Sequence, residues 1–136
     1  MYNNSLIYMT STTESAVLAN GVIPLTTIQR RRGKVIQNGT NSVILNAPGY
    51  YKITASVTFT APVTGDVIVE LQKNNVSVPG ISGSETITTA TTELRTITLT
   101  GIVRVFCSED IATLTLVNTG VAITAENVAF DVEYLD

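Results

Sequence analysis

The chain has 136 residues and a formal net charge of −3, with 44% hydrophobic but only 14% charged residues. This length fits one domain, which we expect to span residues 1–136. The acidic balance does not attract nucleic acid, and no stretch approaches the roughly 18 apolar residues of a membrane span, so we predict binding to neither nucleic acid nor membrane. So few charges predict a surface that is partly covered by a partner.

The residue types favour β-structure and argue against catalysis. Thr, Val and Ile make up 51 of the 136 residues, and such β-branched side chains fit a pleated sheet better than a helix. We therefore predict an all-β fold. The absence of histidine removes the commonest general base and the commonest metal ligand. Cys107 is the single cysteine, which excludes an intrachain disulfide, and we expect it to be a small buried residue.

Short apolar runs and apolar–polar alternation, the period of a β-strand, recur along the whole chain. From the N-terminus, these runs lie at residues 5–9, 16–18, 22–25, 35–37, 43–45, 49–59, 66–73, 76–80, 91–106, 111–117 and 128–135. The Asn38-Gly39 pair between two of them predicts a hairpin. Gly101, inside the longest run, predicts a bulge or a bend. Residues 81–90, rich in Ser, Gly and Thr, indicate a loop. About eight to ten strands without an amphipathic helix are typical of a sandwich or jelly roll.

Three motifs follow one another in an order that is characteristic of a known family. Residues 48–53, Pro-Gly-Tyr-Tyr-Lys-Ile, are similar to a Pro/Ala-Gly-x-Tyr-x-Ile strand. Residues 71–74 are similar to the start of a Leu-x-x-Asn-Gly turn, although Asn75 stands where the family has glycine. The last run, residues 130–135, completes the order. Over residues 5–135 the chain resembles the TNF-like and complement-subunit-like jelly-roll superfamily. The likeness is greatest to its bacterial and phage members, such as spore-surface collagen-like glycoprotein C-terminal domains and phage head-fibre or decoration proteins.

This resemblance implies a ten-strand jelly-roll sandwich that assembles as a homotrimer, with its inner sheet packed around a threefold axis. On the strands that match the inner sheet, the candidates for trimer-interface residues are Tyr51, Phe130 and Tyr134. Each aromatic side chain can bury roughly 150–250 Å², so a few per subunit could sustain an obligate oligomer. The same side chains could instead fill the sandwich core of a single chain, and both interpretations stay open.

The function implied is that of a non-enzymatic virion structural protein, namely a homotrimeric phage capsid decoration or head-fibre protein. Such a protein would be made in the host bacterial cytoplasm and lie on the virion surface, with capsid or other virion proteins as partners. The alternative is a trimeric head module of a fibre tip or bacterial spore surface that binds carbohydrate or a receptor, such as a cell-surface glycan. The predicted loops, dominated by Thr, Ser, Asn and Gly, favour the structural role.

A cluster of cations supplies one candidate contact with such a partner. Arg30, Arg31 and Arg32 are consecutive, and we place them on an exposed loop as candidate docking residues. In a trimer, three copies of this cluster would face an acidic capsid or cell-envelope surface. A loop that is simply hydrated explains the same cluster.

The acidic residues predict neither catalysis nor a metal site. The close pairs are Asp131 with Glu133 and Glu109 with Asp110, and both fit a solvated strand face or turn. A Ca²⁺ site needs six to eight oxygen ligands, and no loop of regularly spaced acids is present. Because glycine-rich phosphate loops are missing too, we predict no cofactor and no metal.

Overall fold

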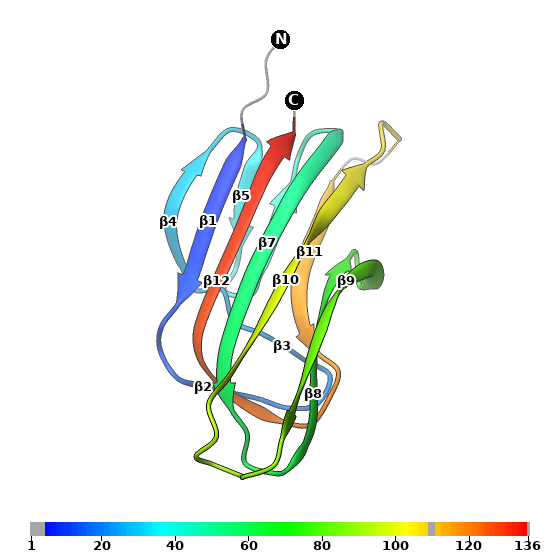
Figure 1. The fold of residues 1–136 in the computed structure, drawn as a ribbon. Helices are drawn as coiled ribbons and strands as arrows, with labels where there is room; N and C mark the ends of the chain where they lie inside the picture. The colour runs from blue at the N-terminus through cyan, green and yellow to red at the C-terminus, as the bar shows by residue number, and fades with distance from the viewer. Residues whose placement is uncertain (1–4, 109–110, 136) are drawn as a thin grey trace.

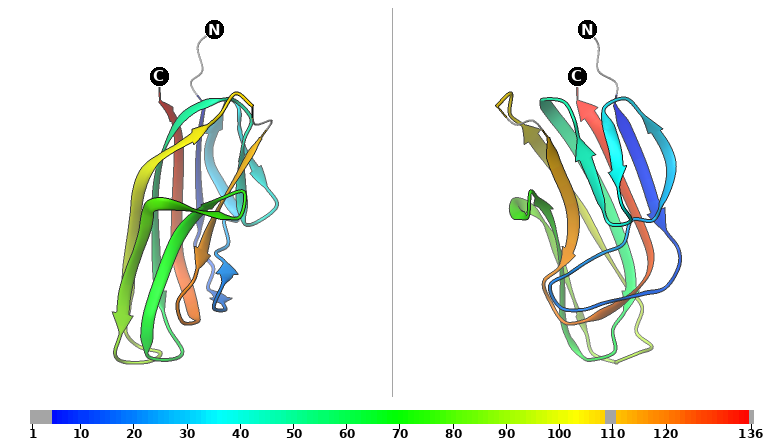
Figure 2. Two further views of the ribbon diagram at one scale, coloured as in Figure 1. Left: turned by 90° about the vertical axis from the view of Figure 1, so that its right-hand side faces the viewer. Right: turned by 180° about the vertical axis from the view of Figure 1, so that it is seen from behind.

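The computed structural model describes residues 5–108 and 111–135, which form two antiparallel sheets packed face to face (Figures 1 and 2). The strands are β1 (Leu6–Ser11), β2 (Ser15–Val17), β3 (Gly21–Val22), β4 (Thr27–Arg32), β5 (Val35–Asn38), β6 (Ser42–Leu45), β7 (Gly49–Thr60), β8 (Gly65–Lys73), β9 (Val76–Ile87), β10 (Arg95–Val105), β11 (Ala112–Asn118) and β12 (Ile123–Leu135). The described residues contain no helix, and the prediction of an all-β fold is confirmed. None of their segments could therefore cross a bilayer as a helix.

The two sheets have the strand orders of a jelly roll. Sheet A runs β10-β7-β12-β1-β4, with β2 paired to β12, and sheet B runs β5-β6-β11-β8-β9, with β3 paired to β11. The two main paths hold the ten expected strands, and β2 and β3 are short additions. The last strand, β12, lies between β7 and β1, so both ends of the described chain meet in the middle of sheet A (Figure 1).

The core lies between the sheets, and β7 shows how the sequence builds it. Its apolar residues alternate with polar ones, so one face of the strand turns inward while the other meets solvent. The inward residues are fully or almost fully buried: Tyr51, Ile53, Ala55, Val57 and Phe59. Matching inward positions on the other long strands join them in one contiguous hydrophobic cluster. The strand pattern that is clearest in the sequence thus carries the centre of the core.

Some local predictions are wrong, each for a physical reason. Residues 27–32 form β4 instead of a loop, because pairing with β1 satisfies their backbone while their side chains stay exposed. Residues 81–87, which were predicted to be part of a loop, belong to β9, because their backbone pairs with β8. Pairing of β10 with β7 runs through Gly101 without a bulge. A Cβ at Gly101 would lie 2.5 Å from Cγ1 of Ile81, so the glycine makes room for a side chain of the facing sheet. Cys107 is exposed, because it follows the last buried residue of β10.

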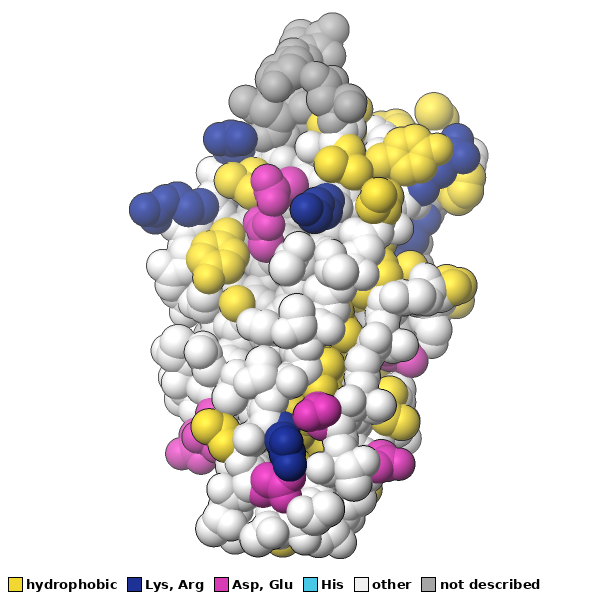
Figure 3. Space-filling view, viewed as in Figure 1, with side chains coloured by type: hydrophobic (Ala, Val, Ile, Leu, Met, Phe, Trp, Pro, Cys, Tyr) yellow, Lys and Arg dark blue, Asp and Glu magenta, His cyan; other side chains and the backbone are white. Residues whose placement is uncertain are grey.

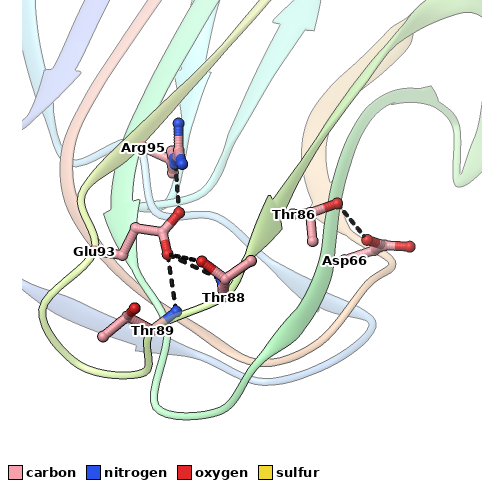
Figure 4. Close-up of polar contacts among 6 residues, drawn as sticks. All are labelled: Asp66, Thr86, Thr88, Thr89, Glu93 and Arg95. Carbon is pink, nitrogen blue, oxygen red and sulfur yellow. Dashed lines mark hydrogen bonds and ion pairs between the residues drawn. The ribbon is translucent and has the colours of Figure 1, made fainter.

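Glu93 holds the connection between β9 and β10 (Figure 4), which lies at the lower end of the molecule in Figure 1. Its Oε1 accepts hydrogen bonds from the backbone N–H groups of Thr88 and Thr89, both at 2.9 Å, and from the Thr88 hydroxyl at 3.0 Å. Its Oε2 accepts one from Nε of Arg95 at 2.6 Å. The bond from Arg95, followed by those from the two threonines, lowers the pKa of Glu93 to about 2. The loop is therefore organised around an ionised carboxylate.

Asn118 organises the connection between β11 and β12 from a fully buried position. Its Nδ2 donates to the carbonyl oxygen of Val121 at 2.8 Å, and its Oδ1 accepts from the N–H of Gly120 at 3.1 Å. Any side chain at Gly120 would clash with the backbone of β8 at Asp66. This connection is thus fixed by one buried amide and one close backbone approach.

Candidate functional site

The outer face of sheet A, which turns away from the core, is the candidate site. Five strands contribute to it, from β10 at one edge to β4 at the other. Across its middle, the register aligns small uncharged side chains in a row: Thr98, Ser56, Ala129 and Thr10. In the next row, the hydroxyl groups of Thr58 and Thr96 lie 2.9 Å apart. Figure 3 shows this middle region as largely white, without a charged side chain.

Near the upper end of this face, four side chains form what we call the acidic pad: Leu6, Tyr8, Asp131 and Glu133. Leu6 lies directly across from Glu133, and Tyr8 lies across from Asp131, in the pairing of β1 with β12. Tyr8 is 37% exposed although it is aromatic. The pad therefore combines two neighbouring carboxyl groups with apolar surface.

The two carboxyl groups of the pad repel each other. The pKa of Asp131 is raised to about 7, first by its partial burial and then by the hydrogen bond and negative charge of Glu133. Lys52, which lies directly across from Glu133 on β7, opposes this rise with its positive charge. On the other side of the pad, Arg30 lies across from Tyr8 and Arg32 across from Leu6, so the carboxyl pair lies between cations of β7 and β4.

At the β10 edge, four side chains form what we call the basic corner: Lys73, Ile102, Arg104 and Phe106. The Arg104 guanidinium carbon lies 4.4 Å from the centre of the Phe106 ring, and Nζ of Lys73 lies 5.3 Å from it. Nζ of Lys73 also donates to the backbone carbonyl of Arg104 at 2.7 Å. Ile102 and Phe106 are 59% and 47% exposed. The corner borders an open groove of about 450 Å³ against the start of β9, and both of its charged side chains are cations.

The three aromatic residues that were candidates for the trimer interface lie on the inward side of sheet A. Tyr51 and Phe130 have an exposure of 0% within one chain, so neither side chain has surface left to offer a neighbouring subunit. Tyr134 packs against the same core from its upper end and stays partly exposed. Of the two interpretations that the sequence left open, Tyr51 and Phe130 follow the core one within a single chain, because strand alternation sends them toward sheet B and sends their neighbours, such as Tyr50, outward.

The arginine cluster lies on the edge strand β4. Arg30 lies across from Tyr8 and Arg32 lies across from Leu6, so both arginines belong to the outer face of sheet A. Arg31 lies at the intervening position, and its guanidinium donates to the carbonyl oxygens of Val35 at 2.9 Å and Gly33 at 3.1 Å. The cluster is therefore split between a solvent-facing pair and one residue that holds the turn into β5.

Exposed apolar residues on this face are the functional candidates that sequence reasoning missed. They are Tyr8, Tyr50, Ile102 and Leu135. The sequence does hold a signal for them: on each strand, an apolar residue stands at a position where the alternation expects a polar, outward-facing one. Within the described ranges, no three His, Cys, Asp or Glu side chains lie close enough to hold a metal ion. The Glu109–Asp110 pair lies outside the described residues.

Comparison with solved structures identifies the fold, whereas no family model matches the chain and no curated protein matches its sequence. The globular domain of the zebrafish complement 1qA protein has a TM-score of 0.70 at 10% identity, over 97% of this chain and 98% of that one. Eiger TNF from S. frugiperda has a TM-score of 0.62 at 12% identity, over 99% of this chain and 94% of that one. PRD1 vertex protein P5 has a TM-score of 0.57 at 16% identity, with both chains covered completely. The chain therefore has the TNF-like and C1q-like jelly-roll fold, which a phage vertex protein shares.

Proposed function

We propose that the chain is a non-enzymatic structural protein of a virion and that its working unit is a homotrimer. The observation that carries the proposal is the outer face of sheet A, which is uncharged across its middle and exposes apolar side chains at its upper end. Exposed apolar side chains that gather in one region often mark an interaction site. A second copy of the same chain is the partner that is present wherever the protein is made.

The size of this face suits an assembly interface. Without β4, which carries the docking arginines, strands β10, β7, β12 and β1 have 11, 12, 13 and 6 residues. With strands about 4.8 Å apart and about 3.3 Å per residue, these four cover roughly 19 by 35 Å, or about 670 Å². A stable interface of standard size buries about 800 Å² on each partner. The face alone nearly reaches this area, and the adjoining β10 edge adds more.

Placement on a virion is supported by the likeness to PRD1 vertex protein P5, which extends over the whole of both chains. The outward arginines of β4 supply the contact in this proposal. Arg30 and Arg32 lie at the edge of sheet A, and in a trimer three such pairs would face an acidic capsid surface. This arrangement supports a role in capsid decoration or in a head fibre.

Two measurements test the proposal. Sedimentation equilibrium should give three times the 14.5 kDa of one chain, and the chain should be detected by mass spectrometry in purified particles of the virus that encodes it. A chain that is monomeric at all concentrations defeats the trimer, and absence from particles defeats the virion role.

Attachment can be tested separately from assembly. The double substitution Arg30→Ser/Arg32→Ser should leave the sedimentation of the trimer unchanged and reduce its occupancy on particles. Gln29→Ser is the control on the same edge strand, because Gln29 is exposed and uncharged. Full occupancy of the double variant would show that the arginines are not the docking residues.

A further inference from the structure

Two turns of the chain contain an Asn-Gly pair, Asn20-Gly21 and Asn38-Gly39. Such a pair can react with itself, because glycine has no Cβ to shield its backbone nitrogen from the amide carbon of the asparagine side chain. The glycine nitrogen, after losing its proton to hydroxide, forms a bond to this carbon. The bond from the same carbon to the amide nitrogen then breaks, and the amide nitrogen leaves as ammonia.

The product of this first step is a five-membered succinimide ring. Water opens the ring at either carbonyl carbon and leaves aspartate or isoaspartate, in which the main chain runs through the side-chain carbons. The sequence therefore marks two candidate sites for a modification that consumes only water.

Which of the two pairs reacts depends on two structural conditions. The glycine N–H has to be free of other hydrogen bonds, because it is the nucleophile of the first step. The peptide link between the two residues also has to turn until the glycine nitrogen reaches the side-chain carbon. A link that is stitched to neighbouring strands turns only after a local opening of the structure, and each bond that this opening breaks slows the reaction.

The link between Asn38 and Gly39 meets both conditions. Asn38 ends β5 with an exposed side chain, and Gly39 is exposed at a φ of +65°, where a Cβ would meet nothing within 4 Å. The Ser42 hydroxyl donates to the backbone carbonyl oxygen of Asn38 at 2.9 Å, and the N–H of Leu25 donates to that of Thr40 at 2.7 Å. Within residues 5–108 and 111–135, no hydrogen bond uses the Gly39 N–H or the Asn38 side-chain amide.

The link between Asn20 and Gly21 meets neither condition. The Gly21 N–H already donates to the carbonyl oxygen of Leu18 at 2.9 Å, and the Asn20 N–H donates to the backbone carbonyl oxygen of Asn118 at 2.6 Å. Gly21 also belongs to β3 and pairs with Asn118 on β11. A Cβ at Gly21 would lie 2.8 Å from the Leu18 carbonyl oxygen, so the surroundings of this link are tight.

We propose that Asn38 is a site of self-modification, at which the folded chain converts this asparagine into aspartate or isoaspartate, whereas the fold protects Asn20. Opening the Asn38 link loosens only the last pair of the β5–β6 hairpin, Asn38 with Ser42. The conversion adds one negative charge at an exposed turn of a chain whose net charge is −3. It needs one chain alone and does not depend on the proposed trimer or on the virion role.

Peptide mapping by mass spectrometry tests the proposal on the unsubstituted chain. At mildly alkaline pH, the folded chain should accumulate the acid form at Asn38 at least about ten times faster than at Asn20, a ratio that corresponds to 1.4 kcal/mol in the free energy of opening. In concentrated urea neither link is held by the fold. The two rates should then agree within about threefold, which is less than that tenfold difference.

Two matched variants connect the reaction to the residue. Asn38→Asp and Asn20→Asp each remove one amide that can leave as ammonia, and they change the net charge equally. Aspartate also tolerates the positive φ of Asn20. Asn38→Asp should remove most of the ammonia released by the folded chain, whereas Asn20→Asp should leave the release unchanged. Because both asparagines are exposed, both variants should keep the circular dichroism spectrum of the parent.

Faster conversion at Asn38 in the folded chain, with similar rates in urea, supports the proposal. It is overturned if Asn20 reacts as fast as Asn38 in the folded chain, or if neither reacts over a period in which the chain in urea converts both. A release of ammonia that Asn38→Asp leaves unchanged overturns it as well.

Discussion

The ring of Tyr134 lies edge-on to the ring of Tyr51, with centroids 5.4 Å apart and planes at 73°. The two residues are cross-strand partners on β12 and β7. Space for the Tyr134 ring comes from Gly49, where a Cβ would lie 2.5 Å from Cε1 of Tyr134 and where φ is +136°. Tyr51 also donates its hydroxyl to the carbonyl oxygen of Ala47 at 2.8 Å. This aromatic pair closes the upper end of the core within one chain.

The adjacent tyrosines of β7 should therefore respond differently to substitution. Tyr51→Ala removes a fully buried ring and should lower the free energy of unfolding by about 3–5 kcal/mol, as large-to-small changes in cores do. Tyr50→Ala removes a ring that is 50% exposed, and it should change the stability of one chain by less than about 0.5 kcal/mol. Urea unfolding of both variants checks this prediction. An equal loss of unfolding free energy in the two variants would contradict the orientation of β7, with Tyr51 inward and Tyr50 outward.

Sedimentation of the same two variants reports on assembly. Tyr50 lies on the outer face beside Arg104, whose guanidinium carbon is 5.4 Å from the ring centre. If the outer face of sheet A forms the interface of the proposed trimer, Tyr50→Ala should raise the dissociation midpoint even though folding is unchanged. Tyr50→Phe keeps the ring and serves as the conservative control.

The strand pattern predicts most of the fold because one buried face imposes a period of two on every long strand. The alternation around Tyr51 and Phe130 locates the core strands correctly. It does not say whether the aromatic side of β7 meets the facing sheet or a neighbouring subunit, because both environments are apolar. Only the structure shows that sheet B packs against these residues, so that their side chains are buried in the core of one chain.

Apolar–polar alternation could not predict strands that bury few side chains. Strand β4 exposes all six of its residues, and β9 buries only Ile81 and Ile87, so backbone pairing with neighbouring strands holds both in place. The basic corner was missed for a different reason. Lys73 and Arg104 are distant in sequence, and only the pairing of sheets brings them together.

Asn118 should be among the costliest polar residues to remove. Asn118→Ala leaves the carbonyl of Val121 and the N–H of Gly120 without their buried partner, so the free energy of unfolding should fall by about 1–3 kcal/mol. Asn46→Ala is the matched control, because the Asn46 side chain is exposed. Urea unfolding should separate the two variants, and an equal effect would refute the role of the buried amide.

Glu93 should make the β9–β10 loop sensitive to acid. Its pKa is lowered in the folded chain to about 2, from 4.5, so its stabilising contribution is present above about pH 4.5 and is lost as pH falls through about 2. Glu93→Gln removes the charge that Arg95 and the two threonine N–H groups share. The amides of Thr88 and Thr89 should then exchange with solvent faster at pH 6, measured by NMR. Thr86, whose hydroxyl donates to Asp66 at 2.7 Å, is the internal control and should be unaffected.

The carboxyl pair of the acidic pad should give the opposite pH dependence. The pKa of Asp131 is raised in the folded chain to about 7, from 3.8, so the folded state holds more protons than the unfolded state between these values. Stability should therefore fall as pH rises from about 4 to 7 and level off above it. The groups that face Asp131 are Glu133 on its own strand, Lys52 on β7 and, beyond Tyr8, Arg30 on β4.

Asp131→Asn tests this dependence directly, because it removes the titrating group and keeps a side chain of similar size. The variant should gain stability over the parent as pH rises from 5 to 8, with the largest difference above pH 7, in urea unfolding at fixed chain concentration and ionic strength. Glu14→Gln removes an exposed carboxylate away from this face and should not reproduce the gain. A carboxyl titration of Asp131 by NMR in the parent chain should show a midpoint near 7. If Asp131→Asn and the parent lose stability in parallel with rising pH, ionisation of Asp131 beside Glu133 does not destabilise the folded chain.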